Sequence, residues 1–509
     1  MAGQATKPSA DALKEEGNAL FAKKDYEAAI RKYTEALKLD ENNAVLHANR
    51  SACSFNRKRY QDAMTDARRA TEIDPSYSKE WSRAAAAHAA LGDEHASAMC
   101  WKKALDALPT ANLSAAEQSQ KDLYEAKLRI MQKNLRKPVE SAQPKTATAL
   151  PSFTDAPSWV RAKTMISEML ASGTQSSAFV IADCEWANDL PINEMIETRS
   201  YKAWVAAGPE YVKVEALKLL ESQGWDVTRP ALAITVRSWI LKGIVAGCFH
   251  DSQGTGIEFL DRALEILRWG QEEWTDVPKD TRGAIFDLSY VLGVKSLYLI
   301  LWLMACKKDS DMFPEETLLE KAEALIKESD DVPYDNETNS IGFDLTYRRY
   351  PRGRAYCMIG WYHDVASEID PEGGKSEASI LEHHLRAGEA YLQAANEYAI
   401  DDIYHLWYMN AGLQQFWRCG APLCVTMPMM KMVREHLPNV KKIWEHDQMT
   451  KTGRTGFELT MKMEKQYREG LDNGTLTIDQ APIPDEYVLD EIAVPEWTED
   501  MVASIMKLL

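Results

Sequence analysis

The 509-residue sequence lacks the features that mark a membrane or secreted protein. Its longest apolar run, Val291 to Cys306, carries Lys295 and is shorter than the ~20 residues that a membrane-spanning helix needs. No apolar segment follows the first methionine, so no secretory signal is predicted. The eight cysteines form no Cys-x-x-Cys pair, and most lie in apolar stretches, where a reduced thiol behaves as a small hydrophobic side chain. We expect a cytoplasmic protein without a membrane partner.

Motifs of common enzyme classes are also missing. The segment Gly373–Ser376 reads GGKS, but Ile369 stands where a phosphate-binding loop requires its first glycine. Neither His-Glu-x-x-His nor Gly-x-Ser-x-Gly occurs, and adjacent His383 and His384 cannot both face one metal from a helix. Catalytic groupings such as Ser-His-Asp or Cys-His, whose members can be far apart in the chain, are recognised from a structure and not from sequence spacing. We therefore expect no catalytic residue, no metal and no cofactor, and a protein that is not an enzyme.

Charge is distributed unevenly along the chain. The net charge is −18, whereas residues 1–137 hold 23 Lys and Arg against 19 Asp and Glu, a net of +4. The remaining residues therefore carry −18 − 4 = −22. Nucleic acid is disfavoured as a partner because phosphate binding requires a strongly basic surface. The basic N-terminal segment suits an acidic ligand, although a difference of this size can also arise without a function.

A period of 34 residues organises the first quarter of the chain. Four series recur at this spacing: Gly17, Ser51 and Ala85; Ala29, Ala63 and Ser97; Tyr33, Ala67 and Trp101; Ala36, Ala70 and Ala104. Small residues at fixed places allow paired helices to approach closely, and Pro75 and Pro109 mark helix ends. We predict repeats at 10–43, 44–77 and 78–111, with an amphipathic helix at 114–137 covering the last apolar face.

The segment DYEAAIRKYTEALKL of the first repeat resembles the tetratricopeptide repeat (TPR), a pair of antiparallel helices. The resemblance implies that residues 8–137 form a TPR superhelix of three repeats and a capping helix. The departures are small: Glu41 stands where proline is usual, and Ser97 where alanine is usual. The predicted fold class is all-α.

Five polar residues fall on the first helices of the three repeats. Lys14 and Asn18 are one helical turn apart, as are Lys79 and Arg83, and Asn49 lies 34 residues before Arg83. Neither asparagine is placed to cap a helix, which favours a role for its side chain. Three cations and two amides supply many hydrogen-bond donors, as a pair of carboxylates requires. A stacked array would direct all five toward one groove.

The motifs KEEGN, HANRSA and SKEWSR resemble the dicarboxylate clamp of TPR co-chaperones of the heat-shock-organising and stress-inducible type. In that family the clamp binds the C-terminal Met-Glu-Glu-Val-Asp tail of the ninety- or seventy-kilodalton cytosolic heat-shock chaperones. The resemblance implies that Lys14, Asn18 and Asn49 hold the terminal main-chain carboxylate. It further implies that Lys79 holds the aspartate side chain and that Arg83 contacts acceptors further along the peptide.

The rest of the chain carries weaker signals. Residues 138–157 contain four prolines and are predicted to be a linker, and residues 158–475 a helical, repeat-like or irregular domain of unknown role. Residues 476–509 are predicted to be an acidic, proline-containing tail, in which 476–497 lies extended on that domain; an unattached tail is the alternative. Helical spacing occurs at 210–223, 229–250, 255–274, 282–306, 314–329, 353–369, 375–399 and 404–419. A short strand is an alternative for residues 178–182. The arginines of YRRYPRGR at 347–354 are expected to form ion pairs within the chain rather than to bind an anion.

The leading hypothesis is a co-chaperone or adaptor that binds a chaperone tail through its TPR groove and a second, unknown protein through its C-terminal domain. Two alternatives remain at this level: a helical scaffold that binds internal peptides, and an enzyme delivered to chaperones through an unrecognised catalytic domain. The sequence does not indicate which chaperone is preferred.

Overall fold

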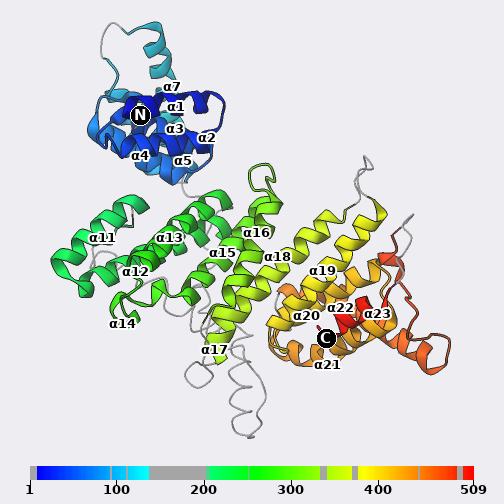
Figure 1. Cartoon of the computed structure of the whole chain (residues 1–509). Coiled ribbons are helices and arrows are strands. Elements are labelled where there is room, and N and C mark those ends of the chain that lie inside the picture. Colours follow the sequence, from blue (N-terminus) through cyan, green and yellow to red (C-terminus); the bar gives the residue numbers. More distant parts are fainter. Residues whose placement is uncertain are drawn as a thin grey trace, which may run out of the picture. The chain divides into compact units, whose positions relative to one another are not determined.

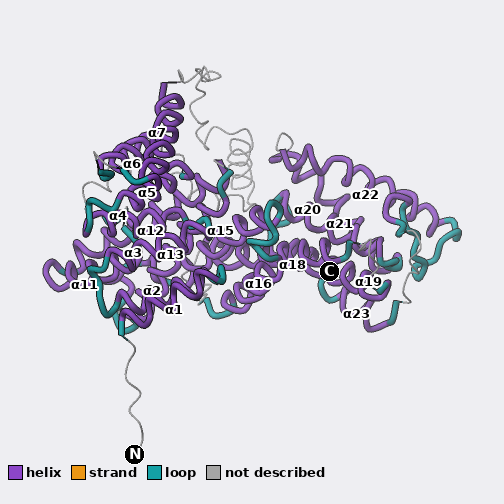
Figure 2. The backbone as a smooth tube through the Cα atoms, turned by 90° about the horizontal axis from the view of Figure 1, so that it is seen from above, coloured by secondary structure: helices purple, strands orange, loops and turns teal. Residues whose placement is uncertain are grey.

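The computed structural model describes residues 9–91, 94–109, 113–136, 203–205, 207–249, 251–332, 341–368, 376–444, 448–489 and 497–509. Every regular element within these ranges is a helix, so the predicted all-α fold is confirmed (Figure 2). The predicted linker at 138–157 and the possible strand at 178–182 lie outside the described residues. The described parts divide into two compact units, residues 1–148 with 201–269, and residues 149–200 with 270–509.

The first unit begins with seven helices, drawn in blue and cyan in Figure 1. They are α1 (Ala10–Ala22), α2 (Tyr26–Leu37), α3 (Ala44–Asn56), α4 (Tyr60–Ile73), α5 (Ser78–Ala90), α6 (Glu94–Asp106) and α7 (Ala115–Arg136). Each helix packs on the next, and α1, α3 and α5 also contact one another in turn, so these three form one layer. Because α1, α3 and α5 begin at residues 10, 44 and 78, positions 34 apart in sequence become neighbours along that layer.

The small residues of the 34-residue period lie where the helices meet. Ala29, Ala63 and Ser97 are fully buried. A Cβ atom on Gly17 would lie 2.6 Å from the ring of Tyr33, so a larger residue there would separate α1 from α2. Ser97 donates a hydrogen bond to the carbonyl of Ala85 at 2.8 Å, which offsets the cost of burying its hydroxyl. The period therefore encodes close helix packing.

Within the described residues the first unit also contains α11 (Pro209–Gln223), α12 (Trp225–Ile244), which continues as a π-helical turn at Val245–Phe249, and α13 (Gln253–Glu273) as far as Trp269. Helix α4 begins after Arg59, whose side chain makes no capping hydrogen bond. The carboxylate of Glu258 on α13 supplies the cap, since it accepts from the backbone N–H of Gln61 at 3.1 Å and of Asp62 at 2.6 Å. Arg262 then pairs with Asp62 at 2.6 Å, which joins α13 to α4.

The second unit contains a longer series of helices (Figure 1). They are α14 (Lys279–Arg282), α15 (Leu288–Cys306), α16 (Glu315–Ser329), α17 (Ile341–Asp344), α18 (Tyr350–Ala366), α19 (Glu377–Glu397), α20 (Ile403–Arg418), α21 (Leu423–Trp444), α22 (Gln448–Asp472) and α23 (Glu499–Met506), with short 3-10 helices at Ala284–Phe286 and Asp485–Tyr487 and a π-helical turn at Leu345–Arg349. Glycines allow close packing here too: a Cβ on Gly388 of α19 would lie 2.8 Å from the ring of Phe416 on α20.

The C-terminal segment packs against the core of this unit, as the sequence predicts. Residues 476–484 run without a helix, and the N–H groups of Leu423 and Cys424 donate to the carbonyls of Gln480 and Ile478 at 2.8 and 2.9 Å. The tail thus satisfies donors that the first turn of α21 cannot pair within the helix. The described end of the tail is helical rather than extended. Thr498 caps helix α23, and Ile505 of this helix is fully buried.

Two described helices, Trp225–Cys248 and Leu288–Cys306, are long and apolar enough to cross a bilayer, with mean hydropathies of 1.4 and 1.7. The structure buries 61% and 44% of their apolar segments within the protein. Core helices of globular proteins have the same length and composition, and the expected lack of a membrane partner stays a prediction.

Candidate peptide-binding site

The five residues predicted to form a clamp all lie on the α1–α3–α5 layer. Lys14 and Asn18 belong to α1, Asn49 to α3, and Lys79 and Arg83 to α5. Lys79 is exposed and the other four are partly exposed, so each can still contact a ligand. Because α3 contacts both α1 and α5, the three helices present these side chains from one continuous layer.

Two of the five residues touch directly across the boundary between the first and second repeats. The Nδ2 of Asn49 donates to the Oδ1 of Asn18 at 3.1 Å. The same oxygen accepts from the hydroxyl of Tyr33 at 2.8 Å, and burial raises the pKa of that phenol to about 12, so it stays a donor. Two donors therefore fix the orientation of the Asn18 amide, whose own N–H groups face away from them.

Arg83 is held next to this pair. Its Nη1 donates to the carbonyl of Ala48 at 2.9 Å, one residue before Asn49, and it also pairs with Glu80. Its side chain is 17% exposed. The structure thus brings Asn18, Asn49 and Arg83 into one connected row.

The two lysines lie one turn before members of this row, and the described contacts do not join them to it. Lys14 pairs with Asp11 at 2.7 Å, and this hydrogen bond to the carboxylate raises the pKa of the lysine. Lys79 is exposed at the first turn of α5. Both are flexible cations at the edge of the row, which suits contact with a carboxylate that arrives from solvent.

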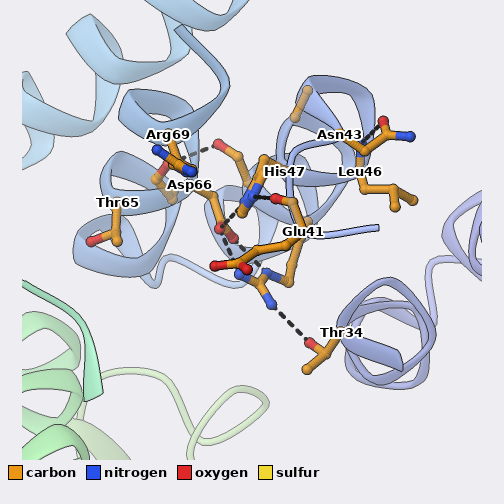
Figure 3. Close-up of polar contacts among 12 residues, drawn as sticks. Thr34, Glu41, Asn43, Leu46, His47, Thr65, Asp66 and Arg69 are labelled. Atoms are coloured by element: carbon orange, nitrogen blue, oxygen red, sulfur yellow. Dashed lines mark hydrogen bonds and ion pairs between the residues drawn. The ribbon is translucent and has the colours of Figure 1, made fainter. Parts of the chain in front are cut away.

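A polar network around the buried Asp66 joins α2, α3 and α4 (Figure 3). Asp66 of α4 accepts from Arg50 at 2.7 and 2.8 Å and contacts Nδ1 of His47 at 3.2 Å. The other imidazole nitrogen of His47 lies 3.1 Å from the carbonyl of Glu41, and Arg50 donates to Thr34 at 3.1 Å. Burial works against the charge on Asp66, but Arg50 and His47 outweigh it and hold the pKa of this carboxyl below its usual range.

Sequence reasoning missed this network and also missed Glu80. The pair Glu80–Arg83 was visible as an i, i+3 spacing of opposite charges in SKEWSR. The network had no such signal, because Thr34, Arg50 and Asp66 come from three different helices. Their proximity depends on how the helices stack.

Three of the four arginines at 347–354 form ion pairs within the second unit, as predicted, whereas Arg354 donates a hydrogen bond to the hydroxyl of Ser296 at 3.3 Å. Arg348 pairs with Asp344 at 2.6 Å, Arg349 with Glu397 at 3.6 Å, and Arg352 with Glu397 at 3.0 Å. Among the described residues no group of three or more His, Cys, Asp or Glu could hold a metal ion.

Residues 17–51 match the TPR repeat family. Over 96 residues the chain is 47% identical to the heat shock protein sti1 homolog of Schizosaccharomyces pombe, covering 19% of this chain and 16% of that protein. It is 44% identical over 110 residues to heat shock protein STI1 of Saccharomyces cerevisiae (21% of this chain, 18% of that protein). It is 42% identical over 135 residues to small glutamine-rich tetratricopeptide repeat-containing protein 2 of the same yeast (26% and 38%).

The resemblance that the motifs predict is therefore confirmed: the N-terminal segment contains TPR repeats similar to those of STI1-type proteins. The matched segment spans less than two fifths of each of these relatives. Among solved structures, the first TPR of Spaghetti (RPAP3) bound to the HSP90 peptide SRMEEVD is similar, at 30% identity, 25% coverage of this chain, 93% coverage of that chain and a TM-score of 0.22.

Proposed function

We propose that the N-terminal repeats bind the acidic C-terminal tail of a cytosolic heat-shock chaperone, and that the chain acts as a cytoplasmic co-chaperone or adaptor. The observation that carries the proposal is the connected row of Asn18, Asn49 and Arg83, with Lys14 and Lys79 one turn before its ends. Amide and guanidinium donors on one surface suit the paired carboxylates of a C-terminal aspartate.

In this proposal Lys14, Asn18 and Asn49 bind the terminal main-chain carboxylate. Lys79 binds the aspartate side chain, and Arg83 contacts an acceptor further along the peptide. A short tail is ordered on binding, so a dissociation constant in the micromolar range, about −8 kcal/mol, is expected. The helices of the second unit would bind another protein, and the chain would have no enzymatic activity of its own.

The test is calorimetric titration of the full-length chain with a peptide ending in Met-Glu-Glu-Val-Asp. The peptide with a free C-terminus should bind, and its C-terminal amide should lose most of the affinity. Equal affinity for the two peptides would instead favour a scaffold that binds internal segments.

Variants make the test specific to the proposed residues. Lys79→Ala and Arg83→Ala should each reduce binding below the detection limit. Arg31→Ala is a matched control, because Arg31 is a 65% exposed cation on α2, outside the α1–α3–α5 layer. Unchanged binding in Arg83→Ala, with the control also unchanged, would contradict the proposed clamp.

A further inference from the structure

A buried carboxylate lies beside one of the proposed clamp residues. Glu80 follows Lys79 on α5, and its side chain is only 1% exposed. Its Oε1 accepts a hydrogen bond from Nη1 of Arg83, whereas its Oε2 is buried and has no hydrogen-bond partner among the described residues. Burying an oxygen without a donor costs free energy, and the ion pair with Arg83 is the described contact that offsets this cost.

The ion pair leaves Arg83 only partly engaged. Nη1 is shared between Glu80 and the carbonyl of Ala48, and within the described part of the chain the other guanidinium nitrogens make no hydrogen bond. A peptide carboxylate that reaches these free nitrogens would therefore place a second negative charge on a guanidinium that Glu80 already neutralises. In a partly buried site two such charges repel each other strongly.

The surroundings of Glu80 contain charges of both signs. Lys79 and Arg83 on α5 favour its ionised form, whereas Asp66 on α4 opposes it, and Tyr77 lies just before α5. Burial is the largest influence and raises the pKa of the Glu80 carboxyl above its usual range, despite the nearby cations.

We infer that Glu80 is an internal anion that competes with the peptide for Arg83, so that peptide binding is coupled to the uptake of one proton by Glu80. The inference rests on the proposed function of the groove. The proton comes from solvent and binds Oε2, the oxygen without a partner, so Oε1 still accepts from Nη1 and Arg83 stays in position. Glu80 thereby weakens the clamp at neutral pH and makes it tighter as the pH falls.

The test separates the charge of Glu80 from its positioning of Arg83. In Glu80→Gln the amide oxygen can still accept from Nη1, but the negative charge is gone. In the full-length chain at pH 7, this variant should bind the free-carboxylate peptide about tenfold more tightly than the wild type in calorimetry. Glu72→Gln is the matched control, since Glu72 is a 52% exposed, ion-paired carboxylate on α4 and its loss should change the affinity less than about twofold.

A second measurement detects the proton uptake itself. Calorimetry in two buffers of different ionisation enthalpy should show a buffer-dependent binding heat for the wild type, which reports proton uptake, and none for Glu80→Gln. Binding by Glu80→Gln that is equal to or weaker than wild type, or a wild-type heat that does not depend on buffer, would overturn the inference while the proposed function stands. Absence of binding by both proteins would overturn the proposed function and the inference together.

Discussion

The N-terminal repeats leave a row of polar side chains accessible in addition to their internal network around Asp66, whereas the second unit pairs polar groups in its interior. On α1, α3 and α5, donors spaced by helical turns and by the 34-residue period remain partly exposed on one layer. In the second unit, His384 and Gln415 face each other at 2.7 Å, and Gln415 donates to Asp364 at 2.6 Å. These groups satisfy one another inside the unit. The difference shows that the 34-residue period makes the positions of these donors readable from sequence, whereas the pairing of His384, Gln415 and Asp364 depends on how an irregular helical core packs.

The comparison predicts that the second unit depends most on apolar volume. Trp417 is 1% exposed and packs in its main core cluster. Trp417→Ala removes the buried indole and leaves a cavity, so the free energy of unfolding of this unit should fall by about 3–5 kcal/mol in urea denaturation followed by circular dichroism. Peptide binding by the N-terminal repeats should be unchanged in calorimetry at temperatures where the variant is folded. Loss of less than about 1 kcal/mol would show that the core around α20 is loosely packed.

The repeats should instead be most sensitive to a buried charge. Asp66→Asn leaves Arg50 and His47 without their carboxylate, and should destabilise the repeats by about 3 kcal/mol at pH 6. Because the pKa of Asp66 is lowered in the folded protein, its contribution is complete above the pKa of an unfolded aspartate and disappears as the pH falls through the folded value. The stability difference between wild type and Asp66→Asn should therefore shrink from pH 6 toward pH 3. A difference that stays constant over this range would mean that shape, not charge, matters at this position.

The smallest expected effect is at the C-terminal helix. The hydroxyl of Thr498 accepts from the N–H of Met501 at 3.3 Å and caps α23. Thr498→Ala should reduce stability by about 1 kcal/mol, whereas Thr498→Ser, which retains the cap, should change it by only a few tenths. Hydrogen exchange of the amides in α23 measures the effect locally. Equal protection in the two variants would indicate that Ile505 alone holds the helix in place.

The sequence predicted most of the repeat segment because one period carries both packing and spacing. Knowing that Asn49 and Arg83 are 34 residues apart was enough to place them on neighbouring helices of one layer. It was not enough to find the hydrogen bond between Tyr33 and Asn18, or the contact of Arg83 with the carbonyl of Ala48, since these depend on side-chain directions that a repeat period does not specify.

Of the eight segments with helical spacing beyond residue 200, three correspond to α11, α12 and α13 of the first unit and five to helices of the second unit, where α21 and α22 were missed. Helix α21 contains Pro428 and Pro438, which are poor helix formers in mid-helix, and α22 contains Gly453 and Gly456. Tertiary packing overrides these preferences: Met429 and Val433 of α21 are fully buried, and a Cβ at Gly456 would lie 2.8 Å from Asn410. Such exceptions become visible only when the packing partner is known.

The cap that Glu258 provides for α4 has a consequence for synthesis of the chain. The carboxylate lies 197 residues after the amide of Gln61 that it accepts from, and ribosomes add about 5–20 residues per second. Helix α4 is therefore synthesised ~10–40 s before the residue that caps it. In a nascent chain stalled before Glu258, the first turn of α4 has no cap and is exposed to water. We expect a protease to cleave this turn faster in stalled chains than in the complete protein.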